Sequence, residues 1–174
     1  MIEKKFIENQ SEVQCKFLSL DLYQSETKQS KEIYIDPRTK QKWEKYEFEF
    51  EDQTNYGIGL RSFPYCSIEE TIEIALTSEF PDEIAGASAL LFELDRRGLE
   101  IREPLLNSIE VRKTEISMDR FETIYWRTEI YDKTNNRQTM GKKLEEIESD
   151  SMYYFETSER AKDLKEKITT ANKS

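Results

Sequence analysis

The stretch Ser67-Ile-Glu-Glu-Thr-Ile-Glu-Ile-Ala-Leu76 is where the hydrophobic period of the chain changes from two residues to about 3.6. Ser67 followed by Glu70 has the spacing of a capping box, in which the serine oxygen accepts a hydrogen bond from a first-turn N–H. Apolar residues then recur at helical spacing, and glutamates occupy the first turns, where the helix dipole favours them. The sequence therefore predicts that a helix begins at this point.

The same helical spacing continues downstream. A second helix is predicted from Asp82 to a cap at Gly98, with small residues from Ala85 to Ala89 that let another backbone come close. A third, shorter helix is predicted within 99–111. Further helical patterns include Phe121 to Thr128 and Leu144 to Ile168, separated by a turn at 135–136. Whether the last pattern is one helix or is broken near 149–151 is left open by the sequence.

The first third of the chain has the shorter period of a β-strand. Tyr46, Phe48 and Phe50 alternate with glutamates between Trp43 and Glu51, which predicts a strand with one face on a core. Residues 31–36 predict another strand, followed by a turn at Asp36-Pro37. Val13 to Leu22 fit a strand or a short amphipathic helix, with a strand favoured. A loop containing Gly57 and Gly59 is expected before a strand at 60–63.

Together these patterns predict one α+β domain over residues 1–174 in which helix predominates. An N-terminal β portion, a strand or hairpin within about 1–66, is expected to pack on a helical layer within about 67–174. The predicted helical hairpin between Ser67 and Gly98 gives this layer a HEAT-like character.

The charge of the chain restricts its partners. Lysine and arginine total 26 against 36 aspartates and glutamates, which gives a formal net charge of −10 and a pI near 4.8. A nucleic-acid partner is not expected, because neutralising phosphates requires a basic stripe. A basic protein partner would be attracted, although the excess acid can also serve only to keep the protein soluble.

The residue types present argue against the commonest catalytic machinery. There is no histidine, which removes histidine-activated nucleophiles and the most common zinc ligand, and five glycines do not form a phosphate-binding loop. No cofactor or metal is predicted, and a carboxylate-pair enzyme is kept as a minor alternative. Cys15 and Cys66 are expected to be reduced thiols, and Cys66 is either weakly activated by the helix that follows it or buried and inert. No signal peptide or membrane span is seen, so a cytoplasmic protein is expected.

Six residues are candidates for contact with a partner. Glu47, Glu49 and Glu51 form an acidic row on one strand face, which suits either a cationic partner or simple protection of an exposed strand. Trp43 beside this row is a binding anchor or a core residue. Asp82 and Glu83 open the second helix, where compensation of the helix dipole is the simpler explanation.

Several blocks of this sequence together resemble a known family. They are Tyr34-Ile-Asp-Pro-Arg-Thr-Lys-Gln-Lys-Trp43, Gly59-Leu-Arg61 with Pro64, the stretch from Ser67 to Ser78, and the stretch from Asp82 to Leu91. In these blocks the chain resembles immunity protein family twenty-seven of bacterial polymorphic toxin systems, over about residues 33–109. It departs from the family pattern at Lys40-Gln41 and at 56–58.

The resemblance implies a function without chemistry. Such proteins bind the toxin domain of a sibling cell in the cytoplasm and neutralise it by occlusion, without a cofactor. The expected partner is a cognate toxin domain, basic in charge and in some cases a nuclease, bound through the acidic surface. The alternative is a HEAT-like adaptor for protein–protein interactions, which rests on the helical hairpin alone.

Overall fold

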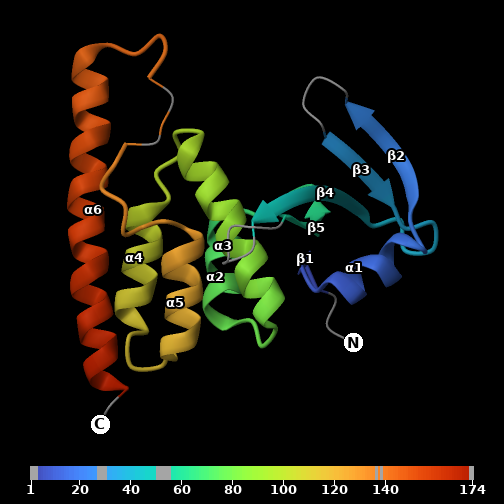
Figure 1. The fold of residues 1–174 in the computed structure, drawn as a ribbon, viewed down its shortest axis with the longest axis horizontal. Coiled ribbons are helices and arrows are strands. Elements are labelled where there is room, and N and C mark those ends of the chain that lie inside the picture. The colour runs from blue at the N-terminus through green and yellow to red at the C-terminus, as the bar shows by residue number, and fades with distance from the viewer. Residues whose placement is uncertain (1–3, 27–30, 50–55, 136, 138, 173–174) are drawn as a thin grey trace.

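A sheet and a layer of helices lie side by side in the computed structural model of the protein (Figure 1). The structure describes residues 4–26, 31–49, 56–135, 137 and 139–172. Helix predominates over strand in these residues, which confirms the α+β class expected from the sequence. The HEAT-like arrangement of the helices and the single-domain boundaries stay predictions.

The β portion is one antiparallel sheet with strand order β1-β5-β4-β3-β2. The strands found in the described residues are β1 (Phe6–Ile7), β2 (Asp21–Glu26), β3 (Lys31–Ile35), β4 (Lys42–Glu49) and β5 (Tyr56–Phe63). The predicted turn between β3 and β4 is confirmed, because Asp36 Oδ1 accepts hydrogen bonds from the N–H groups of Arg38 at 2.9 Å and Thr39 at 3.3 Å. These bonds and Lys16, at 3.2 Å, hold the pKa of Asp36 down at about 2.

The strand favoured for Val13 to Leu22 is wrong for residues 13–17, which lie in helix α1 (Gln10–Phe17), and the alternative of a short helix is correct there. Asn9 caps this helix by accepting hydrogen bonds from the N–H groups of Ser11 and Glu12. Val13 is the buried residue of α1 and packs with three apolar side chains on one face of the sheet, those of Ile7, Trp43 and Leu60. The strand expectation holds from Asp21 onward, where β2 begins.

Gly57 and Gly59 lie inside β5, and the loop expected around them is therefore wrong at these two positions. A Cβ atom on either glycine would be 2.5 Å from an aromatic ring on β4, that of Phe48 at Gly57 and that of Tyr46 at Gly59. The two glycines let these rings lie directly across the neighbouring strand. The lack of a side chain on these two glycines thus makes room for the aromatic rings and does not mark a turn.

The helical layer contains α2 (Ile68–Thr77), α3 (Pro81–Arg96), α4 (Arg102–Val111), α5 (Met118–Arg127) and α6 (Leu144–Ala171). The serine part of the predicted capping box is confirmed: Ser67 Oγ accepts a hydrogen bond from the N–H of Glu70 at 3.1 Å. Gly98 follows the end of α3 and has a φ of +94°, the left-handed conformation that glycine commonly adopts after a helix. The last helix is continuous through 149–151, and it forms the outer edge of the layer (Figure 1).

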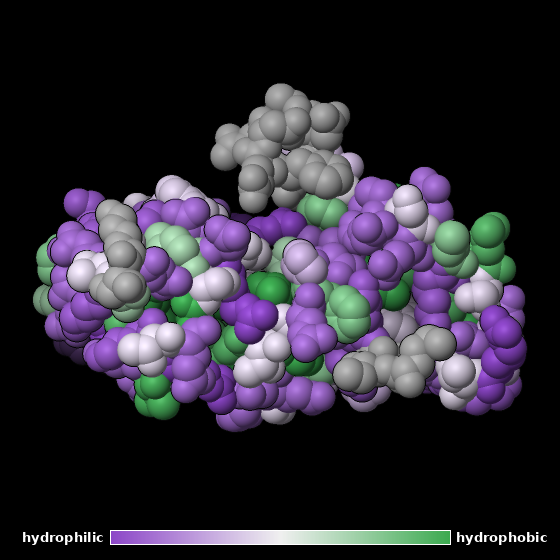
Figure 2. All heavy atoms as spheres, turned by 90° about the horizontal axis from the view of Figure 1, so that it is seen from below, coloured by the Kyte–Doolittle hydropathy of each residue, from purple (hydrophilic) through white to green (hydrophobic). Residues whose placement is uncertain are grey.

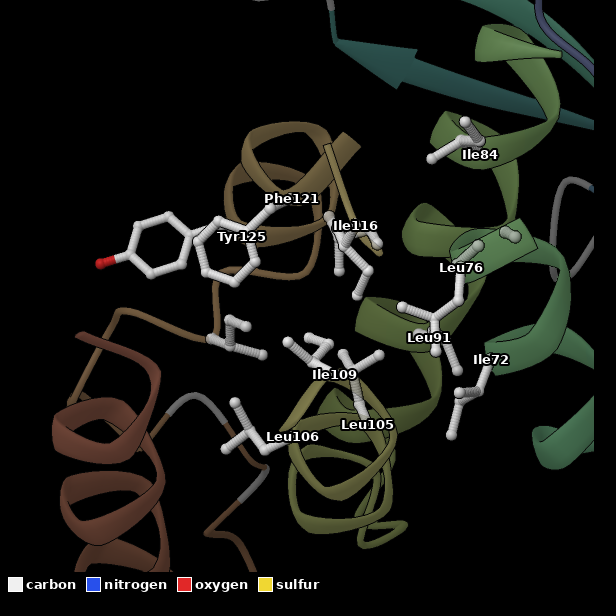
Figure 3. Close-up of a cluster of buried hydrophobic side chains, with 14 of the residues drawn as sticks. Ile72, Leu76, Ile84, Leu91, Leu105, Leu106, Ile109, Ile116, Phe121 and Tyr125 are labelled. Atoms are coloured by element: carbon white, nitrogen blue, oxygen red, sulfur yellow. The ribbon is translucent and has the colours of Figure 1, made fainter. Parts of the chain in front are cut away.

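The main hydrophobic core lies within this helical layer. Figure 3 shows side chains of α2, α3, α4 and α5 converging, among them the fully buried Leu105 and Phe121. The C-terminal half of α6 closes the core with Ala161, Leu164 and Ile168. Among the described sheet residues Phe6 alone joins this cluster, whereas its neighbour Ile7 faces the other way into the core under α1.

The small residues of α3 let it pack closely against α2 and α5, as the sequence predicts, and Gly86 also brings it close to the sheet. A Cβ atom on Gly86 would lie 2.7 Å from Phe6 Cβ and 2.8 Å from the Tyr46 hydroxyl. Gly86 therefore lies directly against β1 and β4, and a larger residue there would push Phe6 of β1 away.

Candidate protein-binding surfaces

The two candidate acids at the start of α3 lie in the junction between helices and sheet. Glu83 is buried, and its carboxylate accepts hydrogen bonds from the Lys5 N–H at 2.6 Å and the Ser78 hydroxyl at 2.7 Å. Asp82 pairs with Lys4 at 3.1 Å. These contacts contradict a partner-binding role for Glu83 and leave Asp82 little free surface. Both carboxylates fix the N-terminal segment on α3.

Glu8, directly after β1, is the most perturbed acid of this junction. It accepts a hydrogen bond from the Tyr46 hydroxyl at 2.9 Å and pairs with Arg127 at 2.6 Å. Burial raises the pKa of Glu8 to about 6, because the loss of hydration disfavours the charged carboxylate by more than Arg127 and Tyr46 stabilise it. A raised pKa is a property of catalytic acids. Here both oxygens are engaged inside the protein, so a structural link between sheet and α5 accounts for the residue.

A second ion cluster completes the junction. Arg61 of β5 pairs with Glu44 of β4 at 3.0 Å and with Glu93 of α3 at 2.5 Å. Its guanidinium also lies 5.1 Å from the ring centroid of Tyr46 and 4.9 Å from that of Tyr65. The sheet and the helices are therefore held together by buried ion pairs as well as by the apolar contacts of Phe6.

The structure describes only part of the acidic row predicted on β4. Trp43 is 1% exposed and packs under α1, so it is a core residue and not a surface anchor. Glu47 is exposed, and its cross-strand neighbour is Ile58, with Tyr56 71% exposed further along β5. The side chain of Glu49 and the whole of Glu51 lie outside the described residues. Glu47 with Ile58 and Tyr56 remains a candidate binding surface.

The helical layer contains a buried ion cluster that the sequence did not reveal. Asp95, near the end of α3, accepts hydrogen bonds from Arg102 Nε at 2.9 Å, the Tyr154 hydroxyl at 2.8 Å and Arg137 at 3.2 Å. Arg137 also pairs with Asp150 of α6 at 2.7 Å. We call these five residues the Asp95 cluster. Isolated charged residues in a sequence give no signal that they will meet, so only the fold identifies this cluster.

The Asp95 cluster fixes the N-terminal half of α6. From 144 to 153, all of which the structure describes, no apolar side chain of the helix is buried. Attachment here comes from the Tyr154 and Asp150 contacts, with the Arg102 guanidinium 3.7 Å from the Tyr154 ring centroid. Burial, and the nearby Asp95 carboxylate, raise the pKa of Tyr154. The first half of α6 is thus held by polar contacts, and the second half by the hydrophobic core.

The solvent side of this first half carries a distinctive set of residues. Three apolar side chains are exposed, with fractions of 69% for Leu144, 58% for Met152 and 51% for Phe155. They share the surface with exposed carboxylates. We define the outer face of α6 as Leu144, Glu145, Glu148, Met152, Phe155, Glu156 and Glu159. The acidic run was visible in the sequence, but the local pattern did not show which of its sides is free.

An open hollow of about 350 Å³ lies beside this face, lined by Lys142, Glu145, Glu146, Ser149 and Asp150. Most of its charged groups already have partners. Lys142 pairs with Asp150, and Glu146 accepts a hydrogen bond from the Lys143 N–H at 2.8 Å. The hollow is a feature of the helix start, and it does not resemble the enclosed, mostly apolar pocket that holds a small molecule.

The two cysteines lie in different surroundings. Cys15 is exposed, Cys66 is half-buried, and both are free thiols. Burial raises the pKa of Cys66 despite a contact with the Ser62 hydroxyl. The helix that follows Cys66 therefore does not activate it, in agreement with the inert alternative.

In the part of the chain that the structure describes, no group of three or more His, Cys, Asp or Glu side chains is placed to hold a metal ion. Within the same residues, no helix has the length and apolar character needed to span a bilayer. Hydrophilic side chains cover most of the face seen from below, with hydrophobic ones scattered among them (Figure 2).

Comparison with known proteins gives no match: no family model, curated protein or solved structure is significantly similar to this chain. The resemblance to immunity proteins therefore rests on the sequence blocks between residues 33 and 109 alone.

Proposed function

We propose that this chain is an immunity protein, which binds a basic toxin domain in the cytoplasm and neutralises it by occlusion without catalysing a reaction. The observation that carries the proposal is the placement of its charges. The buried carboxylates are engaged inside the protein, so the acid excess is presented at the surface.

The charges of the interior nearly balance. The buried acids are Glu8, Asp36, Glu44, Glu83 and Asp95, and all but Glu83 pair with a lysine or arginine. The cations in these pairs and in the Asp95 cluster are Lys16, Arg61, Arg102, Arg127 and Arg137. The net charge of −10 is therefore a property of the more exposed residues. A surface of this kind accelerates association with a basic protein and makes it dependent on salt.

Recovery of the partner from the native host tests the proposal. The tagged protein is purified at low and at high salt, and co-purifying proteins are identified by mass spectrometry. The expected result is a stoichiometric basic toxin domain that is lost at high salt, and whose toxicity is suppressed when both proteins are expressed in one cell. Housekeeping proteins bound independently of salt would instead support an adaptor.

The acidic row on β4 provides a site-directed test of the same proposal. Replacing Glu47, Glu49 and Glu51 with lysine is expected to weaken toxin binding and to reduce its salt dependence. An unchanged affinity and salt slope would exclude this strand from the interface.

A further inference from the structure

We propose that the outer face of α6 is a docking surface for a basic, partly apolar segment of a protein partner. The inference rests on the proposed function for the identity of that partner, the toxin domain. Four features of α6 support this surface: its acidic charge, its exposed apolar side chains, its attachment to the rest of the protein and its length.

The charge pattern distinguishes the two halves of the helix. From Leu144 to Glu159 the sequence contains six acids and neither lysine nor arginine. From Arg160 onward cations return, and they form pairs such as Lys165 with Glu122 at 3.5 Å and Arg160 with Glu110 at 3.1 Å. A solvated helix is normally stabilised by oppositely charged side chains three or four residues apart. Within α6 such a pair joins Lys162 to Glu159 at 2.5 Å, whereas residues 144–158 contain no cation and so form no such pair among themselves.

Apolar side chains interrupt the acids on the same face. Met152 and Phe155 are three residues apart, which places them next to each other on the helix surface, and both are more than half exposed. Single exposed apolar residues are common on protein surfaces. Here two adjacent ones share a helix face with the exposed carboxylates of Glu148 and Glu156, which matches the anchors and the polar rim of an interface. Glu159, at the end of the face, pairs with Lys162 at 2.5 Å.

The helix that carries this face is also held firmly on its opposite side. Tyr154 and Asp150, on the opposite side of the helix, are held by Asp95 and Arg137. Since the helix is fixed before binding, little conformational entropy is lost when a partner docks. The 16 residues from Leu144 to Glu159 span about 24 Å at the rise of an α-helix, enough for a helix or strand of a partner to lie along them.

The negative charge of this face indicates which kind of partner would bind to it. The acids of this face would repel a second copy of the chain, whose net charge is −10, and would repel nucleic acid or an anionic membrane. A segment that carries lysine or arginine on either side of apolar residues satisfies both parts of the surface. Met is adaptable in such contacts, and Phe supplies a large apolar area.

The test uses a fluorescein-labelled helical peptide of lysine and leucine, about 18 residues long, to cover the length of the face. Its affinity for the full chain is measured by fluorescence anisotropy at low and high salt. The charge variant is Glu148→Lys with Glu156→Lys. Its matched control is Glu79→Lys with Glu115→Lys, which makes the same change in net charge at exposed positions off α6. The apolar variant is Met152→Ser with Phe155→Ser.

The α6 charge variant is expected to lose about tenfold or more in affinity at low salt, and the control about twofold or less. The apolar variant, which keeps the charge, is expected to lose about tenfold at both salt concentrations. Circular dichroism and thermal melts establish that each variant is folded. Equal losses in the two charge variants, or no loss in the apolar variant, would overturn the docking surface.

The outcome is separable from that of the proposed function. Peptide binding with the expected variant pattern, but without capture of a toxin, would keep the docking surface and refute the immunity role. Capture of a toxin whose affinity is unchanged by the α6 variants would keep the immunity role and move the interface elsewhere.

Discussion

Replacing Asp95 with alanine is expected to lower the free energy of unfolding by about 3–5 kcal/mol, because it leaves buried cations without their counter-charge. Arg102 is 1% exposed and donates to Asp95 and to the backbone oxygens of Asp132 and Glu129. Arg137 keeps Asp150 as a partner. The larger part of the loss is therefore assigned to Arg102, with a further contribution from the stranded Tyr154 hydroxyl.

Urea denaturation followed by circular dichroism measures this loss, and Asp95→Asn serves as the comparison because the amide keeps a hydrogen-bond acceptor without the charge. Hydrogen exchange adds a local readout. The amides of 144–155 are expected to lose protection before those of 160–170, which the hydrophobic core holds. A loss below about 1 kcal/mol, or an even loss of protection along α6, would refute the role given to the Asp95 cluster.

Three further changes test other parts of the fold. Gly86→Val is expected to cost about 1–3 kcal/mol in a urea melt, since its side chain meets Phe6 Cβ and the Tyr46 hydroxyl; full stability would mean that the sheet shifts freely on α3. Phe121→Ala is expected to cost about 3–5 kcal/mol in the same assay, and a cost under about 1 kcal/mol would contradict its central place in the core. The folded pKa of Glu8, about 6, lies above its ordinary value of 4.5, so the folded protein binds the proton more tightly. Stability should fall by about 2 kcal/mol as pH rises from about 4 to 7, relative to Glu8→Gln, and parallel pH profiles of the two proteins would argue against this shift.

Local patterns predicted the helices well, because each pattern is complete within one segment. Ser67 and the apolar residues that follow it at helical spacing are enough to predict the start of α2, and Gly98 is enough to predict the end of α3. The alternation from Tyr46 to Phe48 likewise identified β4. In these elements the burial of one face and the local backbone preferences agree. The first helix was missed because it buries little more than Val13, although Asn9 offered a cap signal.

The candidate site was harder to predict because it depends on which surfaces the fold covers. Glu83 has the ordinary sequence context of a first-turn acid, yet the N–H of Lys5, next to β1, donates a hydrogen bond to it from 78 residues away. Trp43 lies on the face that α1 covers, and its alternation with polar neighbours does not say which face is inside. The acids of α6 were recognised as a solvated cluster, but their pairing and exposure required Arg137 and Asp95 to be placed in space.

The position of β1 has a consequence for biosynthesis. This strand is made before its partners. Arg61, which pairs with Phe6, follows 55 residues later, and Glu83, which accepts a hydrogen bond from the Lys5 N–H next to the strand, follows Lys5 by 78 residues. Phe6 and Ile7 therefore leave the ribosome long before either core can receive them. Closing such long loops is slow and costs entropy, so β1 is among the last elements to be ordered although it is made before its partners. Until α3 has emerged, the nascent chain exposes the apolar side chains of β1, and this interval is when aggregation or chaperone capture would compete with folding.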